Sequence, residues 1–202
     1  MGRMDRKAAT ADAQAAEIAA RQHGVASSRQ LREAGLSATE IRNRLRRGRL
    51  HRVHRGVYAV GHPGLSDEGR WMAAVLACGE GAVLSHRSAA ELWDLLPAAK
   101  GDVHVTLAGR GGRDKRSGIH LHRSPSLTTT ATTRHKSIAV TTPARTLADL
   151  RRTIDPSLYR RASARRSSET CRWERPRPTT RAASSSGPSC GSADAGACRS
   201  RR

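Results

Sequence analysis

Hydrophobic and polar positions over residues 8–60 predict three short helices followed by a hairpin. The segment ADAQAAEIAARQHG repeats apolar residues at helical spacing, which predicts the first helix. Further along, Ala38, Ile41 and Leu45 fall at i, i+3 and i+7, which predicts a helix with one buried stripe. The segment RLHRVHRGVYAV then alternates large and charged residues around a glycine, a pattern typical of a short two-stranded hairpin.

Two capping signals fix where the second and third helices begin. Ser27 is followed three residues later by Gln30, and Ser37 by Glu40. In both pairs the hydroxyl can accept a backbone N–H bond while the longer side chain reaches back to the cap. Gly35 ends the earlier helix, so only a few residues separate the two. A helix pair joined by so short a turn is the arrangement of a DNA-binding helix-turn-helix.

The outward face of the third helix and the hairpin carry the candidate DNA contacts. An Arg can bond guanine O6 and N7 in a fork, and an Asn can bond adenine N6 and N7. The alternative is a solvated basic helix end, since cations near a C-terminus also favour the helix dipole. The adjacent hairpin favours DNA binding, because it can act as a wing that meets phosphate or the minor groove. The predicted contacts are Ser28, Arg29, Thr39, Arg42, Asn43, Arg46, Arg47, Arg49, Arg52, His54 and Arg55.

The charge of the chain favours the same partner. It has 37 basic and 17 acidic residues, a formal net charge of +20, which favours polyanions such as DNA. The chain has no run of about 18 apolar residues, the length needed to span a bilayer. Its first residues also lack the apolar core of a signal peptide. We therefore expect a cytoplasmic protein without membrane contact.

A second region after the wing has the pattern of a small α+β domain. Helices are predicted from Ser66 and across AVLSHRSAAELWDLLP, and a further one opens at Pro143. Three strands are predicted in DVHVTLAG, SGIHLHRS and HKSIAVTT, separated by a Gly/Arg loop and a Ser/Thr loop. The predicted fold class is thus α+β, with a winged helix-turn-helix over 8–61 and a small α+β domain over 65–155.

Catalytic and metal-binding patterns are missing from the sequence. It has no Gly-rich phosphate loop followed by Lys, no nucleophile elbow and no carboxylate pair at a useful spacing. The pair Ser85-His86 is better explained as a helix start, and His120 and His122 on one strand face are expected to be exposed rather than liganded. The four cysteines lack metal-ligand spacing. We expect no cofactor, no metal and no enzymatic activity.

The order of these segments resembles a known family. HGVASSRQLREAGLSATEIRNRLRRGRLHRVHRGVYAVG, LSHRSAAELWDLLP, VHVTLAGR and TTPARTLADL together are similar to winged-helix proteins of the AbiEi antitoxin type, over about residues 10–152. The resemblance implies a DNA-binding N-terminal domain, autorepression of the operon, and neutralisation of a partner nucleotidyltransferase toxin in a type IV toxin-antitoxin pair. Many such proteins also carry a C-terminal domain similar to very-short-patch repair endonucleases.

That endonuclease-like domain is not evident here. From Tyr159 to Arg202 the sequence has no Leu, Ile, Val, Met or Phe, and we expect residues 156–202 to be a disordered basic tail. Such a tail can add non-specific phosphate contacts. A sharper hypothesis is a frameshift near Ala162, because reading one base earlier turns the Ser and Cys codons into codons for apolar residues.

Taken together, these patterns predict a DNA-binding transcriptional regulator, an antitoxin-like autorepressor of a type IV toxin-antitoxin operon. The expected partners are double-stranded DNA and, by the resemblance, a cognate toxin protein. Two alternatives stay open at this point. One is a truncated, inactive member of the endonuclease-bearing branch, and the other is an antitoxin that acts mainly through protein contacts with its toxin.

Overall fold

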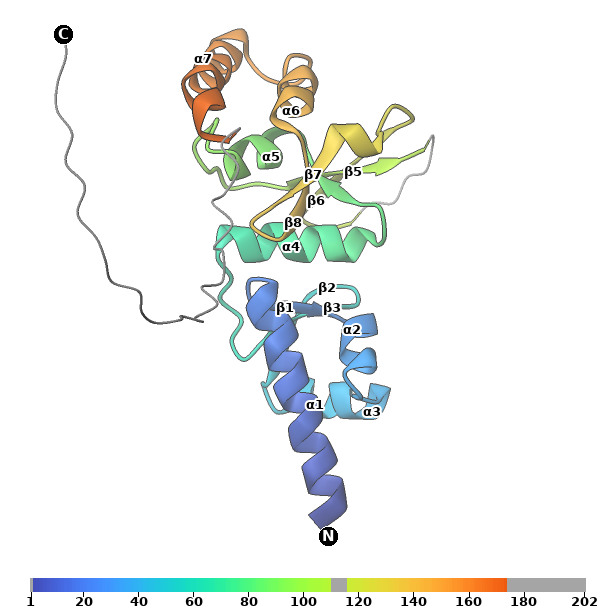
Figure 1. The fold of residues 1–202 in the computed structure, drawn as a ribbon. Helices are drawn as coiled ribbons and strands as arrows, with labels where there is room; N and C mark the ends of the chain where they lie inside the picture. The colour runs from blue at the N-terminus through green and yellow to red at the C-terminus, as the bar shows by residue number, and fades with distance from the viewer. Residues whose placement is uncertain (1, 110–115, 174–202) are drawn as a thin grey trace, which may run out of the picture.

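The structure is a computed structural model that describes residues 2–109 and 116–173, with only the backbone described at 2–9 and 166–173. The N-terminal unit contains three helices and a three-stranded antiparallel sheet of order β1-β3-β2 (Figure 1). It has the predicted winged helix-turn-helix fold, although its first helix starts before residue 8. Its elements are α1 (Gly2–Arg21), β1 (Val25–Ser27), α2 (Ser28–Glu33), α3 (Ala38–Arg46), β2 (Leu50–His54) and β3 (Val57–Val60).

Both predicted capping boxes are present. The Ser27 hydroxyl accepts the Gln30 backbone N–H at 3.2 Å, and the Gln30 side chain accepts the Ser27 N–H at 2.9 Å. Ser37 and Glu40 repeat the exchange at 3.2 and 2.7 Å. Between the two helices Gly35 has φ +92°, a left-handed conformation that glycine adopts without strain. These local bonds therefore fix the angle at which α3 leaves α2.

The core of the N-terminal unit corrects one part of the predicted stripe. Ile41 is buried and Leu45 packs half-buried against the same cluster, but Ala38 is exposed. Ala38 is the first residue of α3, so it projects at the corner of the turn, and Leu36 in the turn supplies the buried side chain instead. The cluster is completed by Ala11, Ala15, Ala26, Leu31, Leu50 and Tyr58.

The second unit is a five-stranded mixed sheet with helices on both faces. Figure 1 shows α4 covering one face, while α5, α6 and α7 lie on the other. The strand order is β6-β5-β4-β8-β7, with β5–β6 and β4–β8 parallel and the other neighbours antiparallel. The elements are α4 (Asp67–Cys78), β4 (Val83–Leu84), α5 (His86–Leu92), β5 (Val103–Ala108), β6 (Ile119–Ser124), a 3-10 turn (Thr129–Ala131), β7 (Thr132–His135), β8 (Ile138–Thr141), α6 (Pro143–Leu150) and α7 (Pro156–Trp173).

Two strands of this sheet were not predicted. The central strand β4 is only two residues long, with Leu84 paired to both β5 and β8. The edge strand β7 lies partly within the predicted Ser/Thr loop. Its Thr133 pairs with Val140, and Thr is a good strand former although it adds no hydrophobic alternation.

The tail prediction is wrong for residues 156–173, which form α7. Ala162 in this helix is fully buried, and Tyr159 packs half-buried against the main core. A small side chain and an aromatic ring thus make the contact that Leu, Ile or Val usually provide. Residues 174–202, the rest of the predicted tail, lie outside the described residues, and the frameshift hypothesis stays a prediction.

Candidate nucleic-acid interface

The outward face of α3 brings four of the predicted contacts together. Thr39, Arg42, Asn43 and Arg46 line, with Leu45, a hollow of about 490 Å³. Arg42 donates to the Thr39 hydroxyl at 3.3 Å, and Arg46 donates to the Asn43 side-chain oxygen. These hydrogen bonds orient two guanidinium groups and one amide on a single face. The amide nitrogen of Asn43 and several guanidinium N–H groups remain available to base edges.

Two of the predicted residues on α2 have different surroundings. The Ser28 backbone N–H and hydroxyl both donate to the Gly56 carbonyl, at 2.7 and 3.1 Å, so Ser28 ties α2 to the wing turn. Arg29 is exposed and lies 3.4 Å from Glu33 one turn further along the same helix. In the same unit Arg47 is the exposed C-cap residue of α3.

The wing places its two arginines in solvent. β2 and β3 pair in antiparallel register, with Arg52 opposite Tyr58, and an irregularity follows between Arg52 and His54. Arg52 and Arg55 are both exposed, and the turn closes at Gly56 with φ +78°. The wing is therefore a short hairpin with one cation on the strand and one at the turn.

The Arg49 side chain lies near the first helix, α1. Its guanidinium lies 3.8 Å from Asp12 of α1, and Arg44 binds the same carboxylate at 2.7 Å. The Arg44 side chain is only 12% exposed and also donates to the Glu40 carbonyl. Neither Asp12 nor Arg44 was among the predicted functional residues. They form a clamp that holds α3 against α1 and thereby sets the orientation of its outward face.

His54 lies at the contact between the two units. Its ring is half-buried and lies close to Gly118 of the second unit. A Cβ atom added to that glycine would lie 3.8 Å from His54 Cε1. Burial lowers the pKa of His54, and the nearby Arg116 guanidinium lowers it further. The side chain therefore faces the second unit.

A group of four histidines occurs in the second unit. His86, His104, His120 and His122 come from α5, β5 and β6, and the His86 and His122 rings stack with centroids 3.7 Å apart. His104 Nδ1 lies 2.9 Å from His122 Nε2. His120 is exposed, as predicted, while His122 is half-buried. Among the described residues, no group of three or more His, Cys, Asp or Glu is arranged to hold a metal ion.

Ser85 marks the start of α5, as predicted, but its hydroxyl makes no capping bond. The hydroxyl instead accepts from Thr106 at 2.7 Å and lies 3.0 Å from His86 Nδ1. Ser85 is fully buried, so it has no access to a substrate.

The histidine group predicts that acid destabilises the protein. Burial, together with the charges of neighbouring histidines, lowers the pKa of His104 to about 4 and that of His122 to about 3. Because these values lie below the unfolded value of 6.5, the unfolded chain binds protons first as the pH falls. The stability is therefore present above pH 6.5 and is lost between 6.5 and the folded values.

We expect the melting temperature to decrease as the pH is lowered from 6.5 toward 4. The free energy of unfolding should fall by at most about 1.4 kcal/mol per pH unit for each histidine, because each ring takes up at most one proton. The variant His122→Gln should flatten the fall, and His62→Gln, which alters an exposed histidine, should not. A pH profile unchanged by His122→Gln would contradict the assignment.

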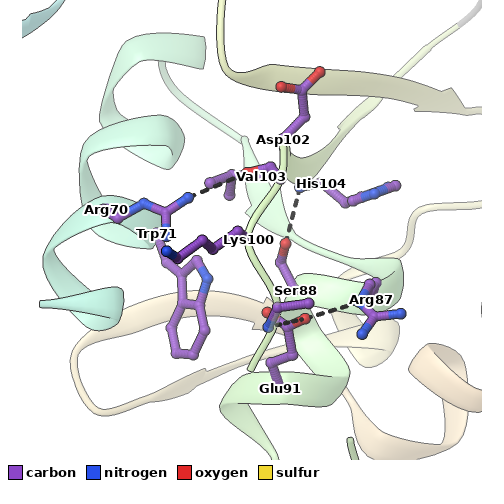
Figure 2. Close-up of a pocket in the computed structure, with 11 residues that line it drawn as sticks. Arg70, Trp71, Arg87, Ser88, Glu91, Lys100, Asp102, Val103 and His104 are labelled. Atoms are coloured by element: carbon purple, nitrogen blue, oxygen red, sulfur yellow. Dashed lines mark hydrogen bonds and ion pairs between the residues drawn. The ribbon is translucent and has the colours of Figure 1, made fainter. Parts of the chain in front are cut away.

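A further hollow, of about 380 Å³, lies between α4, α5 and the segment before β5 (Figure 2). Arg70 donates to the Gly101 carbonyl at 3.1 Å, and Arg87 binds Glu91 at 3.0 Å. Burial raises the pKa of Glu91. Two of the cations that line this hollow are thus bound to protein groups, and none of the predicted DNA contacts lies there.

Comparison with known families identifies the N-terminal unit. Residues 14–61 match the family described as transcriptional regulator, AbiEi antitoxin. The N-terminal unit is similar to this family and is called the AbiEi-type domain below. The match begins within α1 and ends just after β3, so it spans the AbiEi-type domain from the buried part of α1 to the wing. A search of curated proteins finds no match for the chain. Within the described residues, no helix is both long and apolar enough to cross a membrane.

Proposed function

We propose that the chain binds double-stranded DNA through α3 and the wing of its AbiEi-type domain and acts as a transcriptional regulator. The observation that carries this proposal is the outward face of α3, where Asn43 and Arg46 are paired above an open hollow. Asn and Arg are the side chains best suited to adenine and guanine edges in the major groove. The formal charge of +20 favours the approach of a polyanion.

The remaining predicted residues divide into three groups. Thr39 and Arg42 flank the central pair on α3, so they meet base edges or the adjacent phosphates. Arg29, Arg47, Arg52 and Arg55 are exposed and meet the sugar-phosphate backbone, which fixes the register without reading sequence. The third group supports this surface and does not touch DNA. Ser28 donates to the Gly56 carbonyl, Arg49 lies near Asp12, and His54 contacts the second unit.

In this proposal the regulator is an antitoxin-like autorepressor of a type IV toxin-antitoxin operon. The family description of residues 14–61 supports the antitoxin part, and the DNA-binding face supports repression. The chain acts by occupying DNA rather than by catalysis, with a cognate toxin as its protein partner. Fusing the DNA upstream of its own gene to a reporter tests this directly. The wild-type chain should lower expression several-fold, and a reporter unaffected by the chain would contradict autorepression.

The wing assignment makes a prediction about salt dependence. Replacing Arg52 or Arg55 by Ala removes one phosphate contact, so binding to any duplex should weaken to a similar degree. The slope of log affinity against log salt should fall by about 0.9 for each phosphate that is no longer neutralised. Fluorescence anisotropy over a salt series measures it, with Arg134→Ala as the control because this exposed arginine lies in β7. An unchanged slope would place the wing away from DNA.

A further inference from the structure

The sheet of the AbiEi-type domain is packed on both faces. On one face Ala26 and Tyr58 contact the helices α1 to α3. On the other, Val25 and Val57 belong to the main core of the second unit, and Val53 packs against it. Figure 1 shows α4 lying between the two units, directly against the strands β1 to β3. The core of the second unit therefore extends onto this sheet, and α4 cannot leave the sheet without exposing buried valines.

The two units approach each other closely at Gly69 of α4. A Cβ added at Gly69 would lie 2.8 Å from the backbone oxygen of His23, closer than real Cβ contacts come. The neighbouring atom belongs to backbone, so it cannot turn aside as a flexible side chain can. Any residue with a side chain at 69 therefore has to push α4 away from the end of α1.

A polar connection lies beside this glycine. His23 Nε2 lies 2.7 Å from the Lys136 carbonyl oxygen, and Lys136 Nζ donates to Glu68 of α4 at 3.1 Å. His23, Lys136 and Ser137 have φ of +54°, +45° and +64°, conformations that residues other than Gly rarely adopt. Lys136 and Ser137 form the two-residue turn between β7 and β8, in which positive φ is common. The two polar bonds join the end of α1 to this turn and the turn to α4.

We infer that α4 is the support that sets the angle of the wing relative to α3, and that Gly69, His23 and Lys136 are positioning residues for DNA binding. The inference rests on the proposed DNA-binding function. β2 carries Arg52 and packs through Val53 toward α4, while Leu50 of the same strand packs toward α3. A shift of α4 therefore tilts the wing while α3 keeps its own packing.

The test uses the full chain and a duplex selected for tight binding by the wild type. Gly69→Ala should weaken binding roughly tenfold, which is about 1.4 kcal/mol. His23→Ala, which adds no atoms, should weaken it in the same direction, and His62→Ala, at an exposed histidine, should leave it unchanged. Circular dichroism checks that each variant is folded. If Gly69→Ala does not fold, the binding affinities of His23→Ala and Lys136→Gly test the inference instead.

A double-mutant cycle separates positioning from a general loss of structure. In the wild type Arg52→Ala lowers affinity and the salt slope. In the Gly69→Ala or His23→Ala background the wing is already displaced, so Arg52→Ala should add less than about a twofold loss. Fully multiplicative effects, or variants that bind as tightly as the wild type, would overturn the inference. A wild-type chain that binds no duplex would instead refute the proposed function, so the two failures are distinguishable.

Discussion

Replacing Asn43 or Arg46 by Ala is expected to weaken binding to the preferred duplex by about 1–3 kcal/mol, or roughly 5- to 150-fold. Both residues line the hollow on the outward face of α3, and Arg46 holds the Asn43 oxygen in place. In the proposed binding mode, each variant removes groups that read base edges but leaves the surrounding phosphate contacts. Affinity for random duplex should therefore change little. Anisotropy titrations on both duplexes measure the difference.

Arg134→Ala is the matched control for this experiment. Arg134 is an exposed arginine in β7 of the second unit, and it is outside the hollow on α3. Its removal should cost little and should affect the two duplexes equally. If Asn43→Ala or Arg46→Ala weakened preferred and random duplex by the same factor, these side chains would not read sequence.

A chain that ends after Arg152 is expected to lose about 2–4 kcal/mol of its free energy of unfolding, because it discards buried apolar surface. Ala162 is fully buried, and Ile154 and Tyr159 pack against the main core. The sequence alone predicts instead that this cut leaves folding unchanged. Thermal unfolding measures the loss, which amounts to roughly 2–4 °C in melting temperature for each kcal/mol in a chain of this size.

A chain that ends after Trp173 is the control, since it retains all of α7. Its melting temperature should match that of the full chain. Equal stability of the chain that ends after Arg152 and the full chain would show that α7 contributes nothing to the core. A large loss on removal of residues 174–202 would assign a folding role to that segment.

Local sequence signals predicted most of the AbiEi-type domain. The capping boxes at Ser27 and Ser37 depend on residues three positions apart, so they can be found without knowledge of the fold. The helix starting after Ser66 and the one opening at Pro143 were equally accessible, because an N-cap and a first-turn proline are local features. The hairpin followed from alternation around Gly56.

Features that depend on distant residues could not be predicted in this way. Strand β4 has only two residues, too few to show a period, and it exists because Leu84 pairs with strands on both sides. The clamp between Asp12 and Arg44 joins positions that no sequence pattern connects. The same is true of the contact between His54 and the second unit, on which we base the proposed supporting role of His54 in place of the predicted phosphate contact.

The composition of the last part of the chain was misleading in a specific way. The absence of Leu, Ile and Val argued against packing, yet a helix can dock through a small residue where the backbone comes close. Ala162 does this in α7, and Tyr159 adds an aromatic ring one turn earlier. Tertiary context thus gave this segment a buried face that its hydrophobicity alone did not suggest.

Selection of duplexes from a random library by the full-length chain tests the central claim most directly. The wild type should enrich one short motif, bound about a thousandfold or more tightly than random duplex at physiological salt. Asn43→Ala should relax the motif at one position, where the wild type prefers adenine, and leave the other positions unchanged. A library that returns no motif, or a motif that Asn43→Ala and Arg46→Ala leave intact, would contradict recognition of DNA by α3.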